Sequence, residues 1–249
     1  MLQPHHVCAI LLAGGGKAFL PLPAQPGLPA VPVAEPLCPV DFSLANLFYS
    51  GLPHAAVLTQ PPGPGDDHIT RKLTAWQTHL PGLLHWLPSL ERTGSALYLG
   101  TADAVHQNHA PLTAGGFDAL LILAGDQIYQ QDYRDLLRFH HEKEADLTIC
   151  VTTVAPQQSH RYGMLTMDAD QRITSFVEKP TQPLGSHASM GIYVFKTAFL
   201  LDLLAADARD PHSSHDFGRD IIPPMVHNQR VFAYHFNGAW ADVRGLLEK

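Results

Sequence analysis

The sequence has few charged residues and no long apolar run, and each shortage excludes a class of protein. Only 16% of the 249 residues are charged, and the formal net charge is −7. A basic excess is what general nucleic-acid surfaces and anionic-membrane surfaces need, so neither nucleic acid nor a membrane is expected as a partner. No segment approaches the ~20 consecutive apolar residues that span a bilayer.

Cysteine is also scarce. Cys8, Cys38 and Cys150 lack the spacing of a metal site, and two of them lie in predicted strands, which favours reduced, buried thiols in a cytoplasmic protein. The 16 histidines include adjacent pairs such as His5-His6 rather than pairs at i, i+4, so surface positions are favoured over a metal site. The apolar run after His6 has no basic segment before it, which indicates a core strand rather than a signal peptide.

The most informative stretch runs from Asp118 to Tyr129. Its apolar residues 119–124 end abruptly at Gly125-Asp126, a pattern typical of a strand buried on both faces of a parallel sheet. Ligands of such sheets bind beyond the carboxyl ends of the strands, so Asp126 lies where a substrate or a divalent cation would bind. The alternative is that Asp126 is an ordinary turn or cap residue.

Strand patterns alternate with helix patterns along the chain. Strands are predicted at 7–13, 55–59 and 96–98, with 83–90 as an apolar connection, and a helix is predicted from Thr101, which would cap it. This alternation predicts a single α/β domain with a doubly wound, mostly parallel sheet.

Glycines follow the first predicted strand, and charged residues follow later ones. The run Gly14-Gly15-Gly16-Lys17 offers backbone N–H groups to a phosphate, although it matches neither a P-loop nor a dinucleotide fingerprint and a plain turn is the alternative. Lys179 is either a phosphate anchor or a solvated charge. Asp242 and Asp126 could share one Mg²⁺, because magnesium is held by one or two carboxylates plus substrate phosphates.

Several specific strings run along nearly the whole chain. They include Ile10–Gly15 (ILLAGG), Val40–Asn46 (VDFSLAN), Gly100–Val105 (GTADAV), Ile122–Tyr133 (ILAGDQIYQQDY), Phe176–Pro180 (FVEKP), Ala188–Phe195 (ASMGIYVF) and Ser213–Pro223 (SSHDFGRDIIP). In these strings and in their order, the chain resembles bacterial glucose-1-phosphate adenylyltransferase (ADP-glucose pyrophosphorylase), one of the sugar-nucleotide pyrophosphorylases.

The resemblance implies a Rossmann-like nucleotidyltransferase domain over residues 1–249, without the family's C-terminal left-handed β-helix. It implies that ATP and glucose 1-phosphate form ADP-glucose and pyrophosphate, as in glycogen biosynthesis, with the sugar phosphate attacking the α-phosphorus directly. The family pattern assigns Asp126 and Asp242 to Mg²⁺. It assigns the sugar-phosphate side to Gly163, Glu178, Lys179, Ser189 and Trp240. It assigns the ATP side to Gly14, Gly15, Gln60, Gly100, Thr101 and Ala102.

Basic residues of the family pattern are replaced at five positions. The substituted residues are Phe19, Leu28, Cys38, Leu99 and Ala241, and Lys17 is left as the cation expected to compensate in catalysis. Nucleotidyl transfer depends on neutralising charge on the leaving pyrophosphate. Losing one preorganised donor typically costs ~10²–10³ in rate, so the triphosphate half of the site is expected to be impaired.

Two hypotheses follow for function. The chain is either a slow adenylyltransferase or a noncatalytic regulatory paralogue that binds sugar phosphate or nucleotide and modulates a catalytic partner in a homo- or hetero-oligomer. Base specificity stays open to UTP or dTTP. If the lost cations are the defect, Phe19→Arg combined with Leu28→Lys should raise activity.

Overall fold

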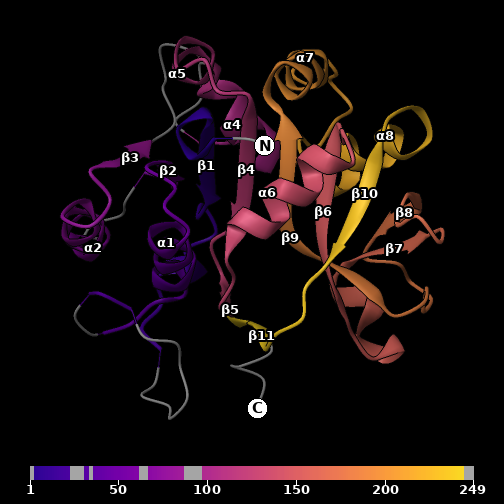
Figure 1. The fold of residues 1–249 in the computed structure, drawn as a ribbon, viewed down its shortest axis with the longest axis horizontal. Helices are drawn as coiled ribbons and strands as arrows, with labels where there is room; N and C mark the ends of the chain where they lie inside the picture. Colours follow the sequence, from indigo (N-terminus) through magenta and orange to yellow (C-terminus); the bar gives the residue numbers. More distant parts are fainter. Residues whose placement is uncertain (1–2, 23–30, 34–35, 62–66, 87–96, 244–249) are drawn as a thin grey trace.

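The computed structural model describes residues 3–22, 31–33, 36–61, 67–86 and 97–243. Within these residues a nine-stranded sheet has helices on both faces, and a separate two-stranded ribbon lies at one end (Figure 1). From edge to edge, the main path of the sheet is β10 (Val231–His235), β6 (Leu147–Thr153), β9 (His187–Lys196), β4 (Ala119–Ala124), β1 (Val7–Leu12), β2 (His54–Leu58) and β3 (Gly82–Trp86).

Along this main path, most neighbouring strands run parallel. Strand β1 pairs in parallel with β2 and β4, β2 with β3, and β6 with β10, whereas β9 runs antiparallel between β4 and β6. A hairpin of β7 (Gly163–Met167) and β8 (Ile173–Glu178) joins the sheet beside β9. The predicted α/β class and mostly parallel sheet are confirmed.

Helices connect the strands and cover the sheet. The α-helices are α1 (Pro39–Tyr49), α2 (Asp67–Gln77), α4 (Thr101–Gln107), α5 (His109–Ala114), α6 (Tyr133–Glu142), α7 (Thr197–Asp207) and α8 (Ile222–Asn228). The 3₁₀ turns are η1 (Pro4–His6), η2 (Lys17–Phe19) and η3 (Pro156–Arg161), and η4 (Phe217–Ile221) is a π turn.

Strand β1 shows why the central strands are continuously apolar. Val7, Ala9 and Leu11 pack in one core with side chains of α1, α2 and α6, while Cys8 and Ile10 pack in a second core with α4, α7 and α8. Successive side chains of a strand point to opposite faces, so a strand covered on both sides has no polar face. The buried run 119–124 of β4 follows the same rule, as predicted.

The third predicted strand was placed wrongly. The strand that pairs with β2 is Gly82–Trp86, and all of it except Gly82 lies in the stretch 83–90 that was expected to be a connection. Gly82 permits this pairing, because a Cβ there would lie 2.1 Å from the Pro53 carbonyl oxygen. Leu97 and Tyr98 are not in a strand, and residue 96 lies outside the described residues. The backbone of Tyr98 bonds instead to the side-chain amide of Gln60.

The ribbon places two distant parts of the chain side by side. It consists of β5 (Gln127–Tyr129), directly after β4, and β11 (Trp240–Asp242), and the strands are antiparallel with Asp242 opposite Gln127. The Val243 N–H donates to the Asp126 carbonyl at 3.0 Å. The ribbon, which lies in the lower half of Figure 1, therefore brings Asp242 to the end of β4.

The three thiols are free and buried, as the sequence predicted. Burial raises the pKa of Cys8 and of Cys150 to about 12, which keeps both thiols protonated and unreactive. Among the described residues, no helix is both long and apolar enough to cross a membrane.

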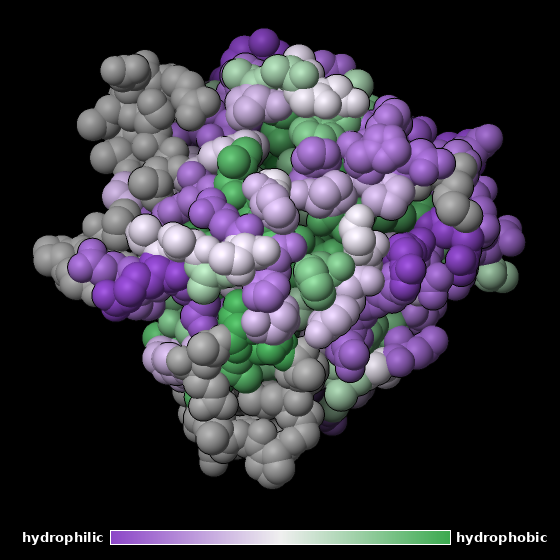
Figure 2. Space-filling model, turned by 60° about the vertical axis from the view of Figure 1, so that its left-hand side comes forward, coloured by the Kyte–Doolittle hydropathy of each residue, from purple (hydrophilic) through white to green (hydrophobic). Residues whose placement is uncertain are grey.

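The larger exposed apolar side chains are spread over several elements. On the face in Figure 2, green apolar residues lie in patches that purple hydrophilic residues interrupt. The exposed set comprises Leu20, Phe48, Tyr49, Leu84, Leu97, Leu99 and Val177. An oligomer or partner subunit stays a prediction.

His140 makes the fold's stability depend on pH. Its side chain on α6 is buried, Nδ1 lies 2.8 Å from Thr148 Oγ1, and burial lowers its pKa from 6.5 to about 4. The unfolded chain therefore binds a proton that the folded chain excludes between those values, so stability falls as pH falls from about 6.5 to 4. The loss from this group is at most about 3 kcal/mol.

Urea unfolding at pH 7 and pH 5 tests this dependence. We expect the wild type to lose more stability at pH 5 than His140→Gln, which cannot titrate. Equal losses in the two proteins would show that His140 is not the responsible group.

Candidate active site

A crevice runs along the carboxyl ends of the parallel strands and consists of adjoining cavities. The central cavity, of about 340 Å³, lies between Lys17 and Lys179. It shares Leu12, Gly15 and Thr101 with a cavity of about 270 Å³ beside Gln60, the Gln60 cavity. At its other end it shares Asp126 and Lys179 with a cavity of about 210 Å³ beside Trp240, the Trp240 cavity.

Asp126 lies where the sequence predicted, directly beyond β4. The preceding Gly125 passes close to β1: its N–H donates to Leu12 O at 3.1 Å, and an added Cβ would lie 3.2 Å from that oxygen. Asp126 does not cap a helix, because β5 follows it and α6 is capped by Asp132. Its side chain lines both the central and the Trp240 cavities, which supports the site interpretation over the turn-or-cap alternative.

Asp242 lines the Trp240 cavity together with Asp126. Arg161 Nη2 lies 2.9 Å from Asp242 Oδ1 and 3.3 Å from Oδ2, and the Tyr162 hydroxyl donates to Oδ2 at 2.7 Å. Sequence reasoning missed both Arg161 and Tyr162. The available signal was their position directly before Gly163, which the resemblance had placed at the sugar.

The donor set at this point fits a magnesium ion. Asp126, directly before β5, and Asp242, in the paired strand β11, line one cavity, and the region already attracts the guanidinium cation of Arg161. No group of three or more potential histidine, cysteine or carboxylate ligands occurs among the described residues. Magnesium needs only one or two carboxylates when phosphates and water complete its shell, so Asp126 and Asp242 would suffice.

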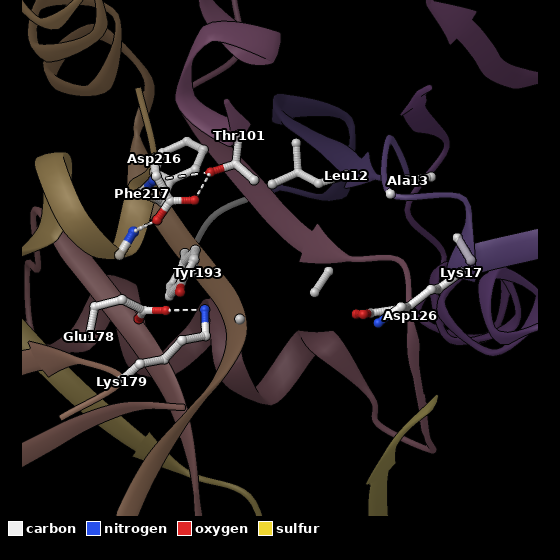
Figure 3. Close-up of a pocket in the computed structure, with 15 residues that line it drawn as sticks. Leu12, Ala13, Lys17, Thr101, Asp126, Glu178, Lys179, Tyr193, Asp216 and Phe217 are labelled. Carbon is white, nitrogen blue, oxygen red and sulfur yellow. Dashed lines mark hydrogen bonds and ion pairs between the residues drawn. The ribbon is translucent and has the colours of Figure 1, made fainter. Parts of the chain in front are cut away.

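Glu178 and Lys179 face the crevice from the end of β8 (Figure 3). Lys179 Nζ lies 2.6 Å from Glu178 Oε1, and the backbone of Lys179 is left-handed at φ +46°. Glycines make room for the Glu178 carboxylate: a Cβ at Gly163 or Gly218 would lie 2.9 or 2.5 Å from its Oε2. The Glu178 carboxylate thus holds the Lys179 ammonium group at the crevice, where an anion could contact it.

Ser189 and Trp240 shape the Trp240 cavity. The Ser189 hydroxyl donates to the Tyr193 hydroxyl at 3.3 Å and accepts from Gly191 N–H at 3.1 Å. Trp240 Nε1 donates to Gln127 Oε1 at 3.1 Å. Ser189 and Trp240, two of the five residues predicted for the sugar side, therefore lie at this cavity and are held by hydrogen bonds.

On the opposite side, five of the six predicted nucleotide-side residues line the Gln60 cavity. They are Gly14, Gly15, Gln60, Gly100 and Thr101. Ala102 is the exception: it is fully buried, and its N–H donates to His215 O at 2.8 Å. The N–H of Ala102 is thus used within the fold rather than offered to the crevice, and its assignment to the nucleotide side stays a prediction.

Thr101 also has a different local role from the one predicted. Gly100 is the N-cap of α4, and Thr101 Oγ1 donates to Asp216 Oδ2 while accepting from Phe217 N–H, both at 3.0 Å. Asp216, Phe217 and Gly218 line the central cavity, and sequence reasoning did not single them out. Thr101 thus fixes the segment that forms one wall of the crevice (Figure 3).

Lys17 lies on η2, across the central cavity from Lys179. Its side chain extends toward Asp126 in the view of Figure 3. It is the cation that the glycine loop presents to this cavity.

The substituted basic positions lie in very different environments. Phe19 and Cys38 are 2% and 3% exposed, pack in the same core, and are joined by Cys38 Sγ donating to Phe19 O at 3.3 Å. Leu99 is 66% exposed and lines the Gln60 cavity. Ala241 lies half-buried in β11, and Leu28 lies outside the described residues.

Comparison with known proteins identifies the family of this chain. The family model described as Nucleotidyl transferase matches residues 8–246. The chain belongs to the nucleotidyl transferase family. The match covers every element that contributes to the crevice.

Individual relatives are similar over nearly the whole chain. The glucose-1-phosphate adenylyltransferase of Methylococcus capsulatus is 39% identical over 95% of this chain and 58% of its own length. That of Clostridium acetobutylicum is 39% identical over 97% and 65%, and that of Bacillus thuringiensis 38% over 98% and 66%. The chain thus spans about three-fifths to two-thirds of the length of these curated relatives.

The burial of Phe19 argues against the rescue by Phe19→Arg. Arginine there would exchange core packing for a buried charge, so we expect a loss of about 3–5 kcal/mol in unfolding free energy and no gain in activity. Leu20→Arg is the matched control, because Leu20 is 40% exposed and should accept arginine with little loss. Thermal or urea unfolding compares the two. Equal stability of both variants would mean that position 19 can turn outward.

Proposed function

We propose that the chain is a glucose-1-phosphate adenylyltransferase whose triphosphate side is weakened. In the cytoplasm it would convert ATP and glucose 1-phosphate to ADP-glucose and pyrophosphate, for glycogen biosynthesis. The observation that supports this most is the position of Asp126, directly before β5, and of Asp242, in the paired strand β11. Both line one cavity, and Lys179 is in the same lining. The names of the relatives indicate the same reaction.

The sugar-phosphate side supplies the nucleophile. Lys179 holds the phosphate of glucose 1-phosphate, and Glu178, Gly163, Ser189 and Trp240 surround the sugar. An oxygen of this phosphate forms a bond to the α-phosphorus of ATP, and the bond from that phosphorus to the bridging oxygen breaks and releases pyrophosphate. Mg²⁺, when bound by Asp126 and Asp242, neutralises charge on the phosphates.

The triphosphate side has fewer cations. Lys17 and the N–H groups of Gly14 and Gly15 are the donors that the glycine loop offers, and Leu99 presents an apolar side chain to the Gln60 cavity. Each missing preorganised donor costs on the order of 10²–10³ in rate, although such losses are not additive. We therefore expect turnover, but slow turnover.

One observation favours a second candidate, the noncatalytic regulatory paralogue. Phe19 and Cys38 contribute to the core, so these replacements have been absorbed into the packing rather than left as gaps at the crevice. In this candidate the chain binds sugar phosphate or nucleotide and modulates a catalytic partner subunit.

A pyrophosphate-release assay with ATP, Mg²⁺ and glucose 1-phosphate separates the candidates. We expect slow release that Asp126→Asn reduces by at least about 10², because that change removes a carboxylate that holds the metal. UTP and dTTP in place of ATP test the base. Release that is absent, or that Asp126→Asn does not alter, would reject the catalytic proposal.

Leu99→Arg tests whether missing cations weaken the triphosphate side of the site. Arginine at this exposed position would add a cation beside the Gln60 cavity, so we expect kcat/KM for ATP to rise at least about tenfold. Leu97→Arg is the matched control: it adds the same charge two residues away at a side chain that is 54% exposed and is not in that cavity's lining. An equal rise in both variants would indicate a general charge effect.

A further inference from the structure

The contact between Arg161 and Asp242 is built from elements far apart in sequence. Arg161 is the last residue of η3, and Asp242 is the last residue of β11. The Tyr162 ring packs edge-to-face on Trp240 with centroids 5.3 Å apart, and its hydroxyl reaches Asp242. Tyr162 thus connects the end of η3 to the end of β11 and keeps Arg161 beside the carboxylate.

The ion pair lies in a sheltered position. The side chains of Arg161 and Asp242 are 18% and 13% exposed, so water screens their attraction less than it screens a surface pair. Asp126 lines the same cavity, and two carboxylates in one cavity repel each other. The guanidinium group therefore offsets negative charge at the place where a divalent cation would do the same.

The geometry of the Arg161–Asp242 contact would let a metal ion replace the guanidinium group. A single nitrogen, Nη2, approaches both oxygens of Asp242, at 2.9 and 3.3 Å. The strongest arginine–carboxylate pairs use two nitrogens in parallel. A metal ion at Asp242 needs the same oxygens, so the metal and this guanidinium group compete for them.

We propose that Arg161 is the resident counter-cation of Asp242, which holds the carboxylate while no divalent cation is bound and leaves it when one binds. This inference rests on the proposed function, because it takes Asp242 as a metal ligand. Arg161 already lines the Trp240 cavity with Lys179. Once released, its charge stays beside that cavity as a second cation for the phosphate of the sugar. Arg161 is thus a positioning residue that makes metal binding weaker and reversible.

Binding of Mn²⁺ without substrates tests the competition directly. The free Mn²⁺ signal in electron paramagnetic resonance gives the affinity of the full chain. We expect Arg161→Ala and Arg161→Gln each to bind Mn²⁺ about tenfold more tightly than the wild type, the change that ~1.4 kcal/mol produces. Arg161→Lys, which keeps the charge, should stay within about threefold of the wild type. The double variant Arg161→Ala with Asp242→Asn should not show this increase in Mn²⁺ affinity.

A control variant separates charge from local structure. Tyr162→Phe removes another group that donates to Asp242 but removes no charge, so its Mn²⁺ affinity should change less than that of Arg161→Ala. Thermal melts identify folded variants, and Arg161→Gln provides the comparison if Arg161→Ala unfolds. Neutral variants that bind Mn²⁺ no more tightly than the wild type would overturn the proposal.

Pyrophosphate release distinguishes this inference from the proposed function. Tighter Mn²⁺ binding in the neutral variants without transfer by any protein would support the counter-cation and reject the adenylyltransferase. Transfer by the wild type, with unchanged Mn²⁺ affinity in the neutral variants, would support the adenylyltransferase and reject the counter-cation. Because Arg161 also lines the sugar side, the neutral variants should raise KM for glucose 1-phosphate.

Discussion

The pairing of β5 with β11 is the interaction on which the whole site depends. The hydrogen bond from Val243 N–H to Asp126 O, 3.0 Å long, fixes the end of β11 against the end of β4. Without this pairing, nothing would hold Asp126 and Asp242, which are far apart in sequence, close together in space. The apolar, doubly covered strand β4 provides the rigid base for this pairing, because its side chains fill both cores. A rigid base is what holds charged ligands in a fixed geometry.

Packing and charge compete in the glycine loop. The turn η2 directs Ala18 and Phe19 into the core and leaves Lys17 at the crevice. Phe19 is only 2% exposed, and its burial stabilises the loop, whereas a cation there would have to reach solvent or a bound phosphate. Cys38 follows the same logic, since burial and the nearby Asp41 raise the pKa of its thiol to about 11 and it bonds to Phe19 O. In the proposed function, Phe19 and Cys38 pack in the core at positions where the resemblance expects cations of the triphosphate side.

The sequence predicted the parts of this structure that local pattern determines. The run 119–124 and the strand beginning at Val7 are buried on both faces, so their apolar continuity was a reliable signal. Asp126 and Lys179 were found because they follow strands. Strand β3 was missed because its fit depends on Gly82 passing over the Pro53 carbonyl, a contact between distant segments.

Side-chain partners were harder to predict than positions. The sequence around Ala102 does not predict that its N–H donates to His215 O. It does not predict the contact of Arg161 with Asp242 either, because 81 residues separate the two. The sequence did not show whether Phe19 and Leu99 are buried or exposed, because both are apolar residues at positions where the resemblance expects a basic one. Only the fold shows that one is in the core and the other at the crevice.

Anomalous diffraction from crystals soaked in Mn²⁺ shows whether Asp126 and Asp242 form one metal site. We expect a peak between the two carboxylates, with Arg161 Nη2 moved off Asp242. A peak elsewhere, or Mn²⁺ held by Asp126 alone while Arg161 stays on Asp242, would reject the shared metal site.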